Sequence, residues 1–211
     1  MLETNPKIFC VGLQKTGTSS LREALKTLGY RVHGMFGIDL PYEELKKTYV
    51  HTAMEIARNY DSVEDMPWPL LYRELDQEFP GSKFILSIRS TDNWYKSVCG
   101  HFRDGAGPLE LLTYGEDLVG GAISNPERFR ETFERHNQSV IDYFAERPGD
   151  LLVLDMEAGH GWAELGAFLG RSDVPAGPFP HVNSAKERRT FANRVRNKLI
   201  RMGVPLPRIG G

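Results

Sequence analysis

The sequence lacks the features that would place the protein in a membrane or in the secreted, disulfide-linked class. Among its 211 residues, no apolar run approaches the roughly 20 residues needed to cross a bilayer. A polar segment, residues 1–7, precedes the first apolar run, so no signal peptide is expected and a cytoplasmic location is predicted. Only Cys10 and Cys99 are present, without metal-ligand spacing, and both are expected to be reduced, in or near the core.

Size and charge predict one domain with a distinctive tail. A chain of this length can form one α/β domain with a full core but is short for two. The net charge is −2, yet residues 186–211 hold eight Lys or Arg and a single Glu, which gives this segment +7 and leaves −9 for the rest. We expect a domain over residues 1–185 and a basic segment, 186–211, that packs on it or closes over it. The basic segment either meets an anionic ligand or forms a solvated helical face.

Near the N-terminus, an apolar run, a glycine-bearing loop and a helical pattern follow one another. Residues 8–11 predict a buried strand, and the apolar positions within 21–28 recur at helical spacing. The N–H groups of the loop and of the helix's first turn would converge on one point, where the helix dipole favours negative charge. Lys15 adds a positive charge, and hydroxyl groups at 18–20 add donors. This arrangement predicts a phosphate or sulfate site, although a simple turn with a helix cap has similar residues.

The loop is close to the nucleotide-binding pattern G-x-x-x-x-G-K-[ST] but departs from it at the lysine. Gly12 and Gly17 have the required spacing, whereas Thr18 stands where the lysine should be and Lys15 lies inside the loop. This departure argues against a nucleoside triphosphatase. Residues 15–19, Lys-Thr-Gly-Thr-Ser, instead resemble the K-x-G-T-[TS] loop with which sulfotransferases hold the 5′-phosphosulfate of PAPS (3′-phosphoadenosine 5′-phosphosulfate).

A second stretch strengthens the resemblance to sulfotransferases. Residues 83–88 predict a buried strand that ends in Arg89, and Ser97 follows eight positions later. Sulfotransferases carry R-[ND]-P-x-[DE]-x-x-x-S after such a strand, and its Arg and Ser bind the 3′-phosphate of PAPS. Here Thr91 replaces the proline, and Asp92 lies one position before the usual acid. An Arg at the end of a strand can bind a phosphate through two hydrogen bonds, while a surface ion pair is the simpler alternative.

The resemblance extends from residue 7 to about 190. It includes a buried strand at 151–155, a helix at 161–170 and the segment 174–183, in the order typical of the C-terminal part of the family. It implies a three-layer, P-loop-like α/β fold, with a central, mostly parallel sheet and helices on both faces. Between the two motifs we expect a strand at 30–33, helices at 41–60 and 70–79, and turns at 61–69. After Ser97 we expect irregular structure at 101–118 and a long helix at 126–144.

The resemblance also implies a reaction and a set of residues that carry it. A hydroxyl or amine of a small-molecule acceptor would attack the sulfuryl group of PAPS in line, adenosine 3′,5′-bisphosphate would leave, and no metal would be required. Lys15 would neutralise the bridging oxygen, and no nucleic-acid partner is expected. The expected nucleotide-binding residues are Gln14, Lys15, Thr16, Gly17, Thr18, Ser19, Ser20, Arg89, Ser97, Lys186, Arg188 and Arg189.

Two residues are candidates for the general base that the acceptor requires. Cytosolic sulfotransferases carry a histidine in T-H-L-P, and residues 64–67, Glu-Asp-Met-Pro, occupy the corresponding place with Asp65 at the histidine's position. A carboxylate can act as the base if burial raises its pKa. His33, the last residue of the strand at 30–33, is the second candidate. Asp65 is favoured over His33, although either side chain could have a structural role.

Two other functions remain compatible with the sequence. A Mg²⁺-dependent kinase or triphosphatase would use Gly12–Ser19 as a variant loop and Asp155, at the end of an apolar strand, as its metal-orienting acid. A non-catalytic nucleotide-binding or partner-binding module would keep the loop but transfer nothing. The acceptor itself cannot be identified, since the aromatic residues that could line its pocket are as often found in a core; these are Phe36, Tyr42, Trp68 and Tyr72.

Overall fold

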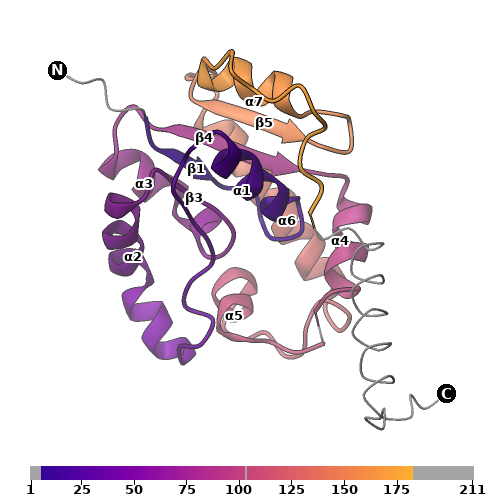
Figure 1. The fold of residues 1–211 in the computed structure, drawn as a ribbon. Coiled ribbons are helices and arrows are strands. Elements are labelled where there is room, and N and C mark those ends of the chain that lie inside the picture. The colour runs from indigo at the N-terminus through magenta and orange to yellow at the C-terminus, as the bar shows by residue number, and fades with distance from the viewer. Residues whose placement is uncertain (1–5, 103, 183–211) are drawn as a thin grey trace, which may run out of the picture.

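The computed structural model describes residues 6–102 and 104–182 and contains one parallel β-sheet in that part of the chain (Figure 1). The strand order is β2-β3-β1-β4-β5, and every neighbouring pair is parallel. The strands are β1 (Ile8–Cys10), β2 (Val32–His33), β3 (Ser62–Val63), β4 (Lys83–Ile88) and β5 (Leu151–Asp155). The predicted α/β class with a parallel sheet is therefore confirmed.

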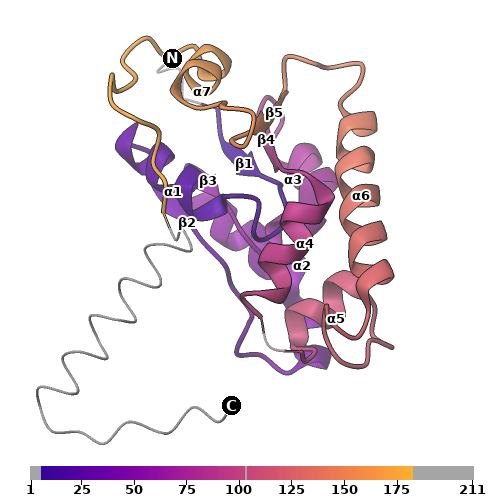
Figure 2. The same ribbon diagram turned by 90° about the vertical axis from the view of Figure 1, so that its right-hand side faces the viewer.

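Helices cover both faces of the sheet, as the three-layer prediction requires. Figure 2 shows α1 and α7 on one side of the strands and α3 and α6 on the other. The helices are α1 (Thr18–Thr27), α2 (Tyr42–Asn59), the 3-10 turn η1 (Trp68–Leu71), α3 (Tyr72–Glu78), α4 (Thr91–Cys99), α5 (Pro108–Tyr114), α6 (Pro126–Tyr143) and α7 (Trp162–Leu169).

Two short elements lie where the sequence predicted none. β3 lies within the predicted turns at 61–69, and α5 lies within the predicted irregular segment 101–118. Two residues cannot show strand periodicity, and β3 exists because it pairs with β1 on one side and β2 on the other. The helix α5 begins at Pro108, a favoured first position, and Glu110 accepts a hydrogen bond from the Gly107 N–H at 3.1 Å. Pro108 and Glu110 are thus a start signal for α5 that is visible in the sequence.

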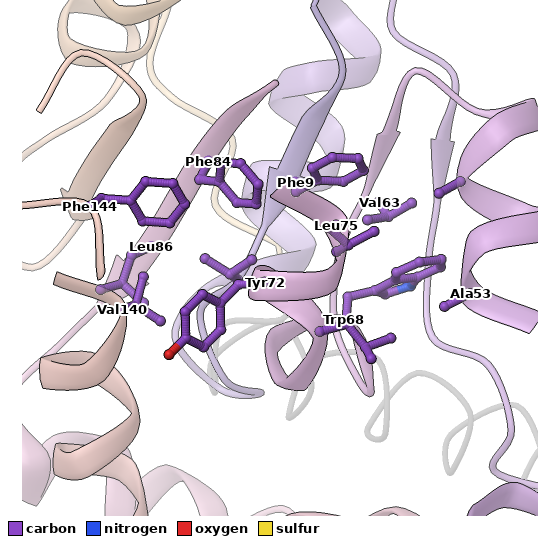
Figure 3. Packing of buried hydrophobic residues seen from close by; sticks show 13 residues of the cluster. Phe9, Ala53, Val63, Trp68, Tyr72, Leu75, Phe84, Leu86, Val140 and Phe144 are labelled. Carbon is purple, nitrogen blue, oxygen red and sulfur yellow. The ribbon is translucent and has the colours of Figure 1, made fainter. Parts of the chain in front are cut away.

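Alternating side chains of the strands build a core on each face of the sheet. Phe9 and Phe84 point to the face covered by α2, α3 and α6, where their ring centroids lie 5.4 Å apart (Figure 3). Ile8, Cys10 and Ile85 point to the opposite face, where they pack against α1 and α7. Cys10 is buried and unpaired, in agreement with the expectation of a reduced core cysteine.

A third apolar cluster extends beyond the carboxyl ends of the strands and joins α4, α5 and α6 to the loop after β1. Trp94 of α4 stacks on Phe133 of α6 with centroids 4.2 Å apart, and Tyr114 of α5 stacks on Phe129 of α6 at 3.7 Å. Leu13, from the loop after β1, is completely buried in the same cluster. The cluster therefore builds a wall beside the carboxyl edge of the sheet.

The order of the strands places a crevice at the end of β1. From β1 the chain builds β2 and β3 on one side of this strand, then crosses to build β4 and β5 on the other. At such a reversal the connections leave in opposite directions, so the carboxyl ends open a ligand crevice between them. No helix in residues 6–102 and 104–182 is long and apolar enough to cross a membrane.

Candidate active site

A cleft of about 970 Å³ opens at this carboxyl edge and gathers most of the predicted site residues. Gln14 to Ser20, Asp65, Arg89 and Ser97 all line it. His33 and Asp155 do not line it. The predicted nucleotide contacts Lys186, Arg188 and Arg189 lie outside the described residues. The described chain ends beside the cleft, where the Val182 N–H donates to the Ser20 hydroxyl at 3.1 Å.

The loop between β1 and α1 is fixed against β4 by a close backbone approach. A Cβ added at Gly12 would lie 2.2 Å from Ser87 Oγ and 2.4 Å from the Ser87 carbonyl oxygen, so only glycine fits there. The Thr16 hydroxyl donates to the Leu13 carbonyl at 2.7 Å and also lies 2.7 Å from Ser87 Oγ. These contacts hold the loop in one conformation over the end of the strand.

Gln14 connects the same loop to the apolar wall. Its Nε2 donates to the Tyr114 hydroxyl at 2.7 Å, and its backbone carbonyl accepts from Trp94 Nε1 at 2.9 Å. The Gln14 Oε1 atom is buried and has no hydrogen-bond partner among the described residues. The loop is therefore held from both sides before any ligand enters, which is the preorganisation that an anion site needs.

Arg89, Asn93, Lys96 and Ser97 form the other wall of the anion-binding region. The helix α4 starts with the Ser90 hydroxyl as its cap, so residues 93, 96 and 97 lie on successive turns that face the cleft. Arg89 Nη1 donates to the Lys15 carbonyl at 3.1 Å. The predicted pairing of Arg89 with Ser97 across one site is thus geometrically possible. Residues 14–20, 89, 93, 96 and 97 are called the phosphate side.

The two candidate catalytic residues that line the cleft share an unusual backbone conformation. Among the described residues, Lys15 (φ 69°) and Asp65 (φ 70°) are the two non-glycine residues with positive φ. Such conformations are costly for residues with a Cβ and cluster at functional sites, where the surrounding structure enforces them. Asp65 follows β3, and its Oδ1 accepts a hydrogen bond from the Met66 N–H at 2.9 Å. This backbone signal is invisible in the sequence.

The electrostatic surroundings of Asp65 suit a proton acceptor. Burial raises the pKa of Asp65, while the Met66 N–H, Arg22 and Lys15 oppose that rise. The preceding Glu64 is fully buried and forms an ion pair with Arg22. Burial, with a contribution from Asp65, raises the pKa of Glu64 to about 7, against the opposing effect of Arg22. Two neighbouring carboxyl groups with raised pKa values therefore lie below the loop.

His33 and Asp155, which do not line the cleft, contact the protein around them. His33 Nδ1 lies 2.9 Å from the Gly34 carbonyl, and its ring packs edge-on against Tyr60 with centroids 4.9 Å apart. Asp155 Oδ1 accepts hydrogen bonds from the backbone N–H groups of Glu157 at 2.9 Å and Ala158 at 3.2 Å, which fixes the turn after β5. In the strand order, β4 also separates β5 from β1. Asp155, the candidate metal-orienting acid, therefore does not line the cleft.

The same cleft is also lined by apolar side chains. Met35 (42% exposed), Ile38 (51%) and Phe102 (36%) are joined there by Met66 and Leu109, and these five residues are called the apolar side. The aromatic residues proposed from the sequence are not part of it: Trp68 and Tyr72 are buried in the core, and Phe36 and Tyr42 lie outside the cleft lining. The sequence therefore predicted which residues of the phosphate side would lie together, but not those of the apolar side.

The described part of the chain holds no cluster of three or more His, Cys, Asp or Glu side chains that could bind a metal ion. Three site residues were also missed by the sequence analysis, namely Asn93, Lys96 and Glu157. Asn93 could have been found, because it lies four positions after Arg89 and four before Ser97, and Lys96 lies one helical turn after Asn93. Glu157 meets Arg89 only through the fold.

Comparisons with known proteins agree with this geometry. The family model of the sulfotransferase domain matches residues 7–188, which includes the loop, Arg89 and Ser97. A curated relative, the "Ava biosynthesis cluster protein M" of Aspergillus versicolor, is 27% identical over 235 aligned positions, which cover 90% of this chain and 88% of the relative. Because the family model spans most of the chain, the protein belongs to the sulfotransferase domain family.

Proposed function

We propose that the protein transfers the sulfuryl group of PAPS to a hydroxyl or amine of an apolar small-molecule acceptor. The observation that carries this proposal is the convergence of Lys15, Arg89, Ser97 and Asp65 on one cleft, next to a wall of exposed apolar side chains. A charged wall suits the nucleotide, and an apolar wall suits a hydrophobic acceptor. The membership of the sulfotransferase family supports the same chemistry.

The phosphate side fits a nucleotide that carries phosphate groups at the 3′ and 5′ positions of its ribose. Lys15, Arg89 and Lys96 bring three cationic side chains to the phosphate side of the cleft. The N-terminus of α1 offers backbone N–H groups and the hydroxyls of Thr18, Ser19 and Ser20 to the 5′-phosphosulfate. Arg89 and Ser97 are proposed to bind the 3′-phosphate, which needs donors with the bidentate geometry that a guanidinium provides.

The proposed step is an in-line displacement at sulfur. The acceptor oxygen or nitrogen forms a bond to sulfur while the bond from sulfur to the bridging oxygen breaks, and adenosine 3′,5′-bisphosphate leaves with the bonding electrons. Asp65 takes the acceptor's proton, a role for which its raised pKa is favourable. Lys15 neutralises the charge that builds on the bridging oxygen, so its contribution is largest in the transition state.

The apolar side of the cleft selects against charged and highly polar acceptors. Met35, Ile38 and Phe102 are among the most exposed large apolar residues of the described chain, and all three face the cleft. Burying these side chains under an apolar ligand stabilises the complex by about 25 cal/mol for each Å² of apolar surface removed from water. Asp65 and Glu110 add negative charge to the cleft lining, so anionic acceptors are disfavoured.

The test is a direct transfer assay. Purified protein is incubated with PAPS and a panel of apolar phenols, alcohols and amines, and sulfated products and adenosine 3′,5′-bisphosphate are quantified by mass spectrometry. The expected result is equal amounts of both products for at least one acceptor, with loss of both in Lys15→Ala. Lys26→Ala, on the exposed face of α1, serves as the matched control and should retain transfer. Transfer of a phosphoryl group from Mg·ATP to the same panel, without sulfation, would contradict the proposal.

A further inference from the structure

Arg89, the guanidinium proposed to bind the 3′-phosphate, already contacts a carboxylate of the protein itself. Glu157 lies just after β5 and lines the cleft. Its Oε1 forms an ion pair with Arg89 Nη2, and its Oε2 accepts a hydrogen bond from Asn93 Nδ2 at 3.1 Å. Two oxygens of one anionic group thus bind donors on two residues of the phosphate side, as two oxygens of a phosphate would.

Other hydrogen bonds hold both Glu157 and Arg89 in place. The backbone N–H of Glu157 donates to Asp155 Oδ1 at 2.9 Å, so the turn that carries Glu157 is fixed at the end of β5. Arg89 is held by its hydrogen bond to the Lys15 carbonyl. Neighbouring Met156 packs against the loop, where a Cβ at Gly17 would lie 2.2 Å from Met156 Cε. Only the Glu157 side chain therefore has to rotate for Arg89 and Asn93 to become available to a ligand.

We propose that the Glu157 carboxylate competes with the 3′-phosphate of the nucleotide, occupying the Arg89–Asn93 donors until a 3′-phosphate displaces it. This inference rests on the proposed function, because it assumes that Arg89 binds the 3′-phosphate. The displaced carboxylate turns toward solvent, which its partial exposure of 36% allows. A phosphate dianion offers more charge and a third oxygen to the same donors, so it wins the competition.

The competition weakens nucleotide binding without abolishing it. Exposed or partly exposed ion pairs contribute little, so losing the Glu157 contact costs the nucleotide about threefold to fivefold in affinity. The cost falls only on ligands that carry a 3′-phosphate, since other ligands leave the pair intact. The same cost applies to adenosine 3′,5′-bisphosphate as a product, and it therefore speeds product release, a step that limits turnover in many enzymes.

Other roles for Glu157 predict a different change in nucleotide affinity when its carboxylate is removed. If Glu157 served to orient Arg89 toward the ligand, removing the carboxylate would weaken binding of the 3′-phosphate. If Glu157 only added negative potential to the cleft, removing it would tighten all anionic nucleotides alike, with or without Arg89. Affinities of paired ligands in single and double variants distinguish these roles from competition.

The experiment is calorimetric titration of the full chain with adenosine 3′,5′-bisphosphate and with AMP, which lacks the 3′-phosphate. Glu157→Ala and Glu157→Gln are expected to bind the bisphosphate about threefold to fivefold more tightly than the wild type and AMP with unchanged affinity. Glu134→Gln removes a carboxylate that accepts a hydrogen bond from the Thr91 hydroxyl and does not line the cleft, so it controls for the loss of one negative charge. It should change neither affinity more than about twofold.

Two outcomes would overturn the inference while leaving the nucleotide site intact. Weaker bisphosphate binding in both Glu157 variants would assign Glu157 an orienting role. An equal gain in affinity for the bisphosphate and for AMP would assign Glu157 a general electrostatic effect. So would a gain in bisphosphate affinity of the same size when Glu157→Gln is added to Arg89→Ala. Failure of the proposed function is distinguishable, because then the wild type would not prefer the bisphosphate to AMP and Arg89→Ala would change nothing.

Discussion

The two sides of the cleft differ in how the chain builds them. The phosphate side comes mainly from two continuous stretches, residues 14–20 and 89–97, that follow the neighbouring strands β1 and β4. The apolar side comes from separate connections, with Met35 and Ile38 between β2 and α2 and Leu109 on α5. A phosphate site requires fixed donors and therefore a fixed local sequence, whereas an apolar pocket requires only shape and can be assembled from distant segments.

The two sides of the cleft also differ in how firmly the surrounding structure holds them. The loop of the phosphate side is fixed by Ser87, Tyr114 and Trp94, while Met35 and Ile38 remain substantially exposed. We therefore expect changes on the phosphate side to alter catalysis, nucleotide binding and stability strongly, and changes on the apolar side to alter the use of one acceptor or another. The following variants test this division, beginning with the largest effect.

Lys15→Ala should cause the largest loss. Removing the cation proposed to stabilise the leaving bisphosphate is expected to lower kcat about 1000-fold, because that interaction would be strongest in the transition state. Affinity for adenosine 3′,5′-bisphosphate should fall far less. Steady-state kinetics with PAPS and one accepted acceptor measure the first effect, and calorimetry measures the second. Wild-type kcat in this variant would remove Lys15 from the reaction.

Gly12→Ala tests whether the phosphate side depends on the close approach of β1 to β4. The new Cβ would meet both the hydroxyl and the backbone of Ser87, and backbone cannot move aside cheaply. The free energy of unfolding should fall by about 3 kcal/mol, measured by urea denaturation. Gly177→Ala is the matched control, since an added Cβ there meets nothing within 4 Å and should change stability by less than about 0.5 kcal/mol. Equal effects in the two variants would contradict this account.

Asp65→Asn and His33→Gln together test the choice of general base. Asp65→Asn should lower kcat about 100-fold, because the amide cannot accept the acceptor's proton, whereas His33→Gln should retain most activity. Burial raises the pKa of Asp65, and only its deprotonated form is a base. The wild-type rate should therefore rise with pH through that raised pKa, and the rise should disappear in Asp65→Asn. A rise that disappears in His33→Gln instead would assign the base to His33.

Arg89→Ala tests the part of the phosphate side that is proposed to bind the 3′-phosphate. The loss of a charge-assisted, bidentate contact should weaken adenosine 3′,5′-bisphosphate binding about 30-fold, whereas AMP should lose less than about threefold. Calorimetry with both ligands gives the ratio. Arg130→Ala is the control, because Arg130 pairs with exposed Asp92 on the surface and does not line the cleft. Equal losses for the two nucleotides would show that Arg89 does not contact the 3′-phosphate.

Ile38→Ala should produce the smallest effect and the one most specific to the acceptor. Its side chain is half exposed in the unliganded cleft, so stability should hardly change. The KM of an apolar acceptor should rise about fivefold, with unchanged affinity for adenosine 3′,5′-bisphosphate. Ile123→Ala removes a similarly exposed isoleucine that does not line the cleft and should leave KM unchanged. A weakened affinity for the bisphosphate in Ile38→Ala would erase the proposed division between the two sides.

The residues of the phosphate side could be predicted to lie together because the physics of these stretches is local. A strand, a glycine loop and a helix N-terminus lie within about 20 consecutive residues, and Arg89 and Ser97 are fixed relative to each other by the start of one helix. The sequence could not place His33, because the direction of a histidine at the end of a two-residue strand depends on its neighbours Tyr60 and Trp68. The larger core elements were predicted from their periodicity alone.

Long-range contacts explain what the sequence did not reveal. Glu157 and Arg89 are separated by 68 residues, and their contact exists only because β4 and β5 are neighbours in the sheet. The strained backbone of Lys15 and Asp65 is likewise a product of the folded chain. The apolar side escaped prediction because its residues are unremarkable apolar side chains, which occur mostly in cores.

The most direct test of the central claim is whether the cleft is a metal-independent site for a 3′,5′-bisphosphorylated nucleotide. Calorimetric titrations of the wild type with adenosine 3′,5′-bisphosphate and with ATP, each with and without Mg²⁺, address it in one set of measurements. The account predicts that the bisphosphate binds more tightly than ATP, with the same affinity with or without Mg²⁺. Preferential binding of Mg·ATP, with weak or no binding of the bisphosphate, would contradict it.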